Sequence, residues 1–240
     1  MISNISLNSG INSSLSSLKE ISKAAEQSQQ RLATGKSVNA VTDDPTKFFN
    51  ALSNLQSADD LNSYKDNISE SIKGMQAANN GIEAISKLAD TAKGIASAAL
   101  ATNDPTQRSQ MAQNYNTIIS QMNQIAKDSG YSGTDFLTGD SQSVKTGKQS
   151  TLEINGFDGT GGAQAVAGNW ESNSEIQASM KQMETSVSNI RSNTATMESQ
   201  SFTFATLQSF QESMANTLKS GADNLTLADM NEEAANTLMN

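Results

Sequence analysis

The chain has 240 residues, a formal net charge of -9, and neither histidine nor cysteine. These absences remove the usual general bases, thiol nucleophiles, zinc ligands and disulfides, so the composition predicts neither an enzyme nor a bound cofactor or metal. The acidic balance argues against nucleic acid as a partner, because phosphate binding requires clustered lysine and arginine.

Polarity in this chain comes from neutral side chains. Ser, Thr, Asn and Gln make up 97 of the 240 residues and charged residues 17%, which is not the composition of a charge-driven disordered chain. Aromatic residues are 5%, so a core must be built from Leu, Ile, Met and Ala, as in long packed helices. We expect neither membrane insertion nor a cleaved signal peptide. No apolar run approaches roughly 18 residues, and Met1 to Ile21 lacks a basic start.

The N-terminal region carries a heptad-like apolar stripe that ends before Gly35. A helix this weakly apolar has little reason to be stable alone, so the stripe predicts pairing with other helices, including those of other copies. A frayed terminus is the alternative. The predicted assembly stripe consists of Ile11, Leu15, Leu18, Ala25 and Leu32.

Both prolines follow an aspartate, at Asp44-Pro45 and Asp104-Pro105, and each pair predicts a helix start. The helix that begins at Pro45 runs to about Ala101, and the helix that begins at Pro105 ends near Ser129. For the adjacent aspartates Asp43-Asp44, helix capping is favoured over acid/base chemistry. Asp59-Asp60 and Glu232-Glu233 read as solvated helix faces, and Gly74, Gly81 and Gly94 as tolerated surface positions rather than points of close approach. The predicted rod core comprises Ile68, Ile72, Met75, Met111, Tyr115, Ile118, Met122, Ile125, Met183, Val187 and Ile190.

The segment from Tyr131 to Trp170 is turn-rich, and Leu152 to Phe157 predicts a small hairpin. Asp158-Gly-Thr-Gly-Gly reads as a flexible turn, because it lacks a P-loop lysine and the spaced acids of a calcium loop. Trp170 is expected to pack between the hairpin and the helices. Ser172 and Glu175 predict a capping box, followed by a helical stripe from Ile176 to about Gly221. A short helical pattern then covers 227–239.

These elements predict a mainly α fold. We expect an elongated helical rod of long antiparallel coiled-coil-like helices with a small β-hairpin region. Within it, Ile118→Asp is expected to be among the most damaging single changes, since it buries an unpaired charge.

Three runs of the sequence resemble bacterial flagellins. The first is Gln30-Arg-Leu-Ala-Thr-Gly-Lys through Asp43-Asp-Pro45. The second comprises Leu88-Ala-Asp through Asn103-Asp, then Ile118 to Ile125, then Gly130-Tyr-Ser-Gly-Thr-Asp-Phe-Leu137. The third is Ala222-Asp-Asn-Leu-Thr-Leu-Ala-Asp-Met-Asn-Glu-Glu-Ala-Ala235. The last is closely similar to the C-terminal region of flagellins from alphaproteobacteria.

This resemblance implies an extracellular subunit of the flagellar filament, exported unfolded and polymerised with other copies of itself for motility. Implied partners are the export apparatus, a secretion chaperone, the filament cap and hook-associated proteins. The implied divisions are 1–44 as N-terminal coiled-coil and filament core, 45–137 as N-terminal rod, 138–171 as a hairpin region in place of outer domains, 172–228 as C-terminal rod, and 229–240 as the start of a C-terminal core helix.

Other functions stay open at this point. A hook–filament junction protein shares the terminal helices and is the alternative within the same system. Flagellins with an inserted metalloprotease need a zinc motif that a histidine-free chain lacks. A soluble secretion chaperone is disfavoured by the length of the heptad stripes.

Two further expectations come from the resemblance. The positions that hold an Arg and a Glu in flagellins bound well by the innate flagellin receptor hold Ala84 and Asn114 here, which implies weak recognition. Family members continue past the segment matching Asn231 to Asn240, so we expect a truncated chain, with little amide protection over 1–35 and no long filaments formed alone.

Overall fold

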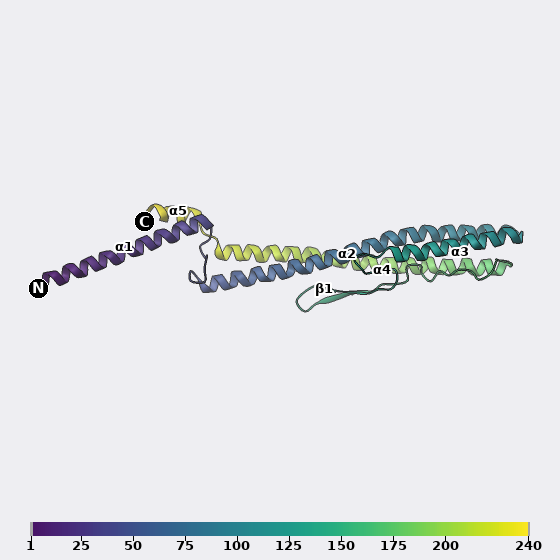
Figure 1. The fold of residues 1–240 in the computed structure, drawn as a ribbon, viewed down its shortest axis with the longest axis horizontal. Coiled ribbons are helices and arrows are strands. Elements are labelled where there is room, and N and C mark those ends of the chain that lie inside the picture. The colour runs from purple at the N-terminus through teal and green to yellow at the C-terminus, as the bar shows by residue number, and fades with distance from the viewer. Residues whose placement is uncertain (1, 240) are drawn as a thin grey trace. The chain divides into compact units, whose positions relative to one another are not determined.

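The structure is a computed structural model that describes the backbone of residues 2–239 and the side chains of residues 10–239. In the described part of the chain, no helix is long and apolar enough to cross a membrane. The elements in chain order are α1 (Ile2–Thr34), α2 (Pro45–Leu100), α3 (Pro105–Asp128), β1 (Gln142–Lys145), β2 (Thr151–Ile154), α4 (Asn173–Thr226) and α5 (Met230–Met239) (Figure 1).

The described residues form two compact units. One comprises 2–61 with 213–239, and the other comprises 62–212. The division falls inside α2 and α4, so each of these helices contributes to both units.

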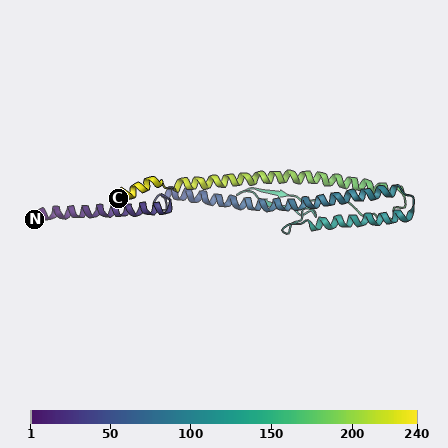
Figure 2. The same cartoon turned by 90° about the horizontal axis from the view of Figure 1, so that it is seen from above.

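In the unit 62–212, α2, α3 and α4 run alongside one another (Figure 2). Buried positions recur every seven residues, as in a coiled coil. On α2 the two series are Ile68, Met75, Ile82, Ala89, Ala96 and Ser71, Ala78, Ile85, Ala92, Ala99. On α4 the series is Ile176, Met183, Ile190, Met197, Phe204. The mainly α fold of long, coiled-coil-like helices is confirmed.

The buried face of α3 differs from the predicted one. Tyr115 and Met122 are fully buried, as is Ile119 at 3% exposure. Met111, Ile118 and Ile125 are only partly buried and pack against the edge of the core. The sequence pattern followed the large apolar residues, whereas the centre of the face also uses the small Ala112 and Ala126.

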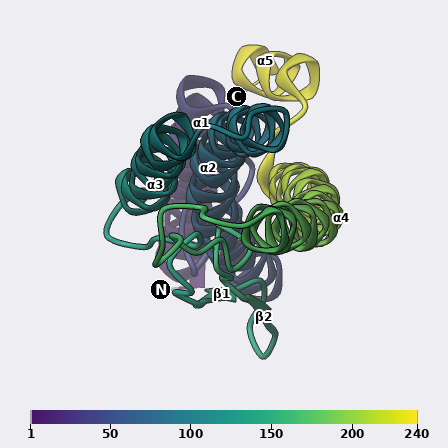
Figure 3. The ribbon, with the colours of Figure 1, turned by 90° about the vertical axis from the view of Figure 1, so that its right-hand side faces the viewer.

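The predicted hairpin is present. β1 and β2 pair antiparallel, with Val144 opposite Leu152, and the hairpin lies beside the helices rather than among them (Figure 3). Val144 and Ile154 are its buried side chains, and the Gln211 amide of α4 donates a hydrogen bond to the Thr146 carbonyl. These contacts attach the hairpin to the helical core.

The predicted turn at Asp158 is present and is held by hydrogen bonds. The Asp158 carboxylate accepts from the backbone N–H groups of Thr160 and Gly162 at 2.9 and 3.0 Å. Gly161, at a φ of +63°, lies where a side chain would meet the Ser186 backbone of α4. Glycine is therefore required for both conformation and space.

Trp170 packs between α3 and α4 rather than against the hairpin. Its ring lies 5.2 Å from that of Tyr115 between centroids, and its indole N–H donates to the Ser179 hydroxyl at 3.0 Å. Burial of an indole with its donor satisfied stabilises this end of the unit.

Two of the three α2 glycines are points of close approach, contrary to our preferred interpretation. A β-carbon at Gly74 would lie 3.1 Å from the Phe136 ring, and one at Gly81 would lie 2.7 Å from the Ser129 β-carbon. At Gly94 nothing lies within 4 Å, so only this position is a tolerated one. The sequence could not distinguish them, because the neighbours come from the loop after α3.

The helix starts have the geometry of capped termini. The carboxylates of Asp44 and Asp104 accept from the N–H groups of Lys47 and Thr106, both at 2.9 Å. The predicted capping box also forms, with reciprocal hydrogen bonds between Ser172 and Glu175 of 3.2 and 3.3 Å. At its other end α4 continues through Gly221 to Thr226, five residues beyond the predicted end.

Candidate assembly surfaces

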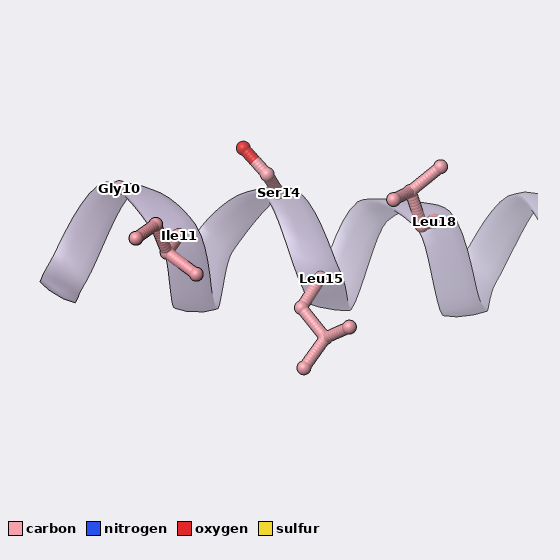
Figure 4. A pocket seen from close by; sticks show the side chains of 5 residues that line it. All are labelled: Gly10, Ile11, Ser14, Leu15 and Leu18. Atoms are coloured by element: carbon pink, nitrogen blue, oxygen red, sulfur yellow. The ribbon is translucent and has the colours of Figure 1, made fainter. Parts of the chain in front are cut away.

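The predicted assembly stripe of α1 divides into an exposed and a partly buried half. Ile11, Leu15 and Leu18 are 60%, 51% and 63% exposed, while Ala25 and Leu32 are partly buried. Figure 4 shows the exposed stretch, which includes Gly10 and Ser14. All five residues that line this open surface come from a single helix, so it lacks the opposing wall of a small-molecule site. An apolar helix face of this kind suits packing against another helix.

The partly buried half of the stripe lies where α5 packs beside α1 (Figure 1). One guanidinium nitrogen of Arg31 donates to a carboxylate oxygen of Glu233 at 3.2 Å. Glu233 is only 6% exposed, and its other carboxylate oxygen has no hydrogen-bond partner. Our interpretation of Glu232-Glu233 as a solvated pair was therefore wrong for Glu233. Nothing in the local sequence signals this ion pair, which joins residues 202 positions apart.

In the same unit, backbone hydrogen bonds join the segment that follows α1 to the residues at and after the end of α4. Gly35, at a φ of +69°, ends the helix, and the Ala228 N–H donates to its carbonyl at 3.0 Å. The Ser37 N–H donates to the Thr226 carbonyl at 2.7 Å. Nearby, hydrogen bonds from the backbone of Ala40 and then Asn39 hold the pKa of Asp43 below its usual value.

The predicted rod-core residues all lie in the unit 62–212. Ile68, Met75, Tyr115, Met122, Met183 and Ile190 are at most 1% exposed. The other five, Ile72, Met111, Ile118, Ile125 and Val187, are partly buried against them. The prediction missed alanines and serines at heptad positions, because small residues carry little signal. The small buried residues that it missed include Ser71, Ala78, Ala92, Ala96, Ala99, Ala112, Ala126, Ser179 and Ser186.

The sequence matches a known protein family. Residues 5–142 match the family described as bacterial flagellin N-terminal helical region. The chain belongs to the bacterial flagellin family. A crystal structure of Bacillus cereus flagellin is similar to this fold with a TM-score of 0.51 and 18% sequence identity, covering 71% of this chain and 94% of that one. No curated protein matches the sequence.

Membership in the flagellin family identifies a structural protein of the filament and favours it over the hook–filament junction alternative. Among the described residues, no group of three or more His, Cys, Asp or Glu side chains is arranged to hold a metal. Burial raises the pKa of Tyr115 to about 12. This ring packs in the core, so the shift reflects packing rather than chemistry.

Ala84 and Asn114, the two positions from which weak receptor recognition is predicted, lie on different helices of this flagellin. Ala84 on α2 is partly buried. Asn114 on α3 is exposed, and its side-chain carbonyl accepts from the Gln110 amide at 3.4 Å. Neither position offers a charge for a charge-assisted contact.

Proposed function

We propose that the chain is a subunit of the extracellular flagellar filament that is exported unfolded, without a cleaved signal peptide, and polymerises through packing of its helices. The exposed stripe of α1, in a member of the flagellin family, is the observation that carries the proposal. Three apolar side chains at least half exposed on one helix are costly in a free monomer, and burial of their exposed parts in a polymer recovers about 1–2 kcal/mol for each.

Unfolded export suits this composition. A chain without cysteine cannot be trapped by disulfides before or after secretion. In this proposal 1–44 and 229–240 belong to the filament core, 45–137 and 172–228 to the surrounding rod, and 138–171 to the outer surface. The export apparatus, a secretion chaperone, the filament cap and hook-associated proteins are the expected partners.

The test is to express the chain in a flagellated bacterium that lacks its own flagellins. In place of the expectation that the chain forms no long filaments alone, we expect surface filaments that contain this chain, seen by electron microscopy, and restored motility, because the exposed stripe of α1 is available for contacts between copies. The matched control is Ile190→Asp, which disrupts the buried α4 series and should be secreted without forming filaments. Secreted wild-type chain that stays dispersed at high protein concentration would contradict the proposal.

We also propose weak recognition by the innate flagellin receptor, because Ala84 and Asn114 replace an Arg and a Glu. The double variant Ala84→Arg, Asn114→Glu should raise activation of receptor-bearing cells at least about tenfold, as charge-assisted contacts often anchor interfaces. Strong activation by the unchanged chain would refute it.

A further inference from the structure

One exposed side of α4 has the chemistry of a protein interface. This surface, the α4 outer face, consists of Ser199, Phe202, Thr203, Thr206, Ser209 and Phe210, all exposed and all within the unit 62–212. Phe202 is 76% and Phe210 56% exposed, in a chain with only seven phenylalanines. The two rings are eight residues apart, about 12 Å along the helix, on the side opposite the buried Phe204.

The α4 outer face is also almost free of charge. Between Arg191 and Glu212 the only charged residue is Glu198, at the edge of this face. Exposed aromatic rings in a charge-depleted surface distinguish the centre of protein interfaces from the remaining surface.

Covering this face leaves few hydrogen-bond donors without partners. The Thr203 hydroxyl donates to the Ser199 carbonyl at 3.0 Å, and the Thr206 hydroxyl donates to the Phe202 carbonyl at 2.9 Å. Because both hydroxyl protons are already used within the helix, a partner can cover them without leaving a buried donor unpaired.

Charge also identifies the kind of partner. Two copies of a chain with net charge -9 repel each other, and they approach at least cost through surfaces without charge. We propose that the α4 outer face is a subunit–subunit contact that packs against a second copy of this chain, with Phe202 and Phe210 as its anchors. The inference rests on the proposed filament function and assigns one contact surface to it. Six residues cover much less than the roughly 800 Å² per partner of a stable complex, so the contact acts together with others in the polymer.

The absence of cysteine allows a direct test. Thr206→Cys places one thiol at the centre of the α4 outer face, and Ser150→Cys, on the exposed hairpin loop, is the control. Maleimide should react equally fast with both thiols in dispersed chains. In filaments, labelling of the Thr206→Cys thiol should slow at least tenfold, while labelling of the control should stay within threefold of its dispersed rate. A benzophenone attached at the Thr206→Cys thiol should yield a covalent dimer of the chain.

The anchors are tested by Phe202→Ser and Phe210→Ser. Each should raise the concentration needed for assembly at least about tenfold, as loss of an aromatic anchor usually does. The melting temperature of the dispersed chain should change by less than about 2 °C, because neither ring is part of the core.

The outcomes separate the two proposals. If filaments form and the Thr206→Cys thiol reacts as fast as in dispersed chains, or crosslinks to a different protein, the contact is refuted while the filament function stands. If the wild-type chain neither forms filaments nor self-associates, both proposals fail.

Discussion

The helix α1 and the helices of the unit 62–212 carry the same kind of heptad-like pattern and have opposite exposures. Met183 and Ile68 are fully buried, whereas Leu15 and Leu18 are more than half exposed. The pattern therefore specifies that one face of a helix is apolar, but not which partner covers that face. In α2 and α4 the partner is within the same unit. At Ile11, Leu15 and Leu18 of α1 it is not.

The difference has an energetic consequence. Burial of a large apolar side chain contributes about 1.5–3 kcal/mol, and α2, α3 and α4 gain this within the monomer. Ile11, Leu15 and Leu18 of α1, which are half to two-thirds exposed, leave about half of this free energy available for contacts between chains. Substitutions in the two regions should accordingly separate folding from assembly.

The largest expected effect is at Ile119 on α3. Ile119→Asp places an uncompensated charge at a site 3% exposed and should cost at least about 4 kcal/mol of unfolding free energy, measured by urea denaturation. Ile118→Asp, one residue away and partly buried, should cost about 1–3 kcal/mol, because its carboxylate can reach water. A larger loss of unfolding free energy for Ile118→Asp than for Ile119→Asp would instead support the buried face of α3 that the sequence predicted.

That pair also shows what the sequence could specify. The helices, their starts and the hairpin follow from capping residues and apolar spacing, which are local. The exact face of α3 depends on which small residues meet α2 and α4, and Ala112 and Ala126 acquire meaning only from those neighbours. The ion pair of Arg31 with Glu233 and the fit of Phe136 against Gly74 are likewise properties of distant segments brought together.

A smaller effect is expected at the α2 glycines. Gly81→Ala should destabilise by about 1–3 kcal/mol, because the new methyl group would meet the Ser129 β-carbon and, at 2.9 Å, a Leu137 methyl carbon. Gly94→Ala meets nothing and should stabilise by up to about 1 kcal/mol through higher helix propensity. Thermal unfolding of the two variants should shift in opposite directions. Shifts of the same sign would contradict the close approach at Gly81.

Tyr115 provides a pH-dependent test of the buried side of the comparison. Burial raises its pKa to about 12, so the folded chain holds this proton more tightly than the unfolded chain. Stability from this group is complete below about pH 10, where the unfolded tyrosine titrates, and is lost as the pH rises toward 12. Tyr115→Phe should cost less than about 1 kcal/mol at pH 7, because its hydroxyl bond to the Ser179 carbonyl is a long 3.5 Å.

In that variant the loss of stability between pH 10 and 12 should be smaller than in the parent chain. Tyr131, whose pKa is raised by its hydrogen bond to Glu70, retains its own contribution. Urea denaturation at pH 8, 10 and 11 measures the difference. If stability falls with pH equally in the two proteins, the pKa of Tyr115 does not differ between the folded and unfolded states.

The smallest effect on folding is expected at Leu15, on the exposed side of the comparison. Leu15→Ser removes a side chain that is 51% exposed, and the unfolding free energy of the dispersed chain should change by no more than about 0.5 kcal/mol. Assembly should nevertheless weaken, because burial of the exposed half of the same leucine supplies about 1 kcal/mol for each subunit in the polymer. Sedimentation of the variant against the parent chain measures this loss, with Ser13→Ala, at an exposed position on the opposite side of α1, as the matched control. Unchanged assembly of Leu15→Ser would mean that the exposed stripe of α1 is not a contact surface.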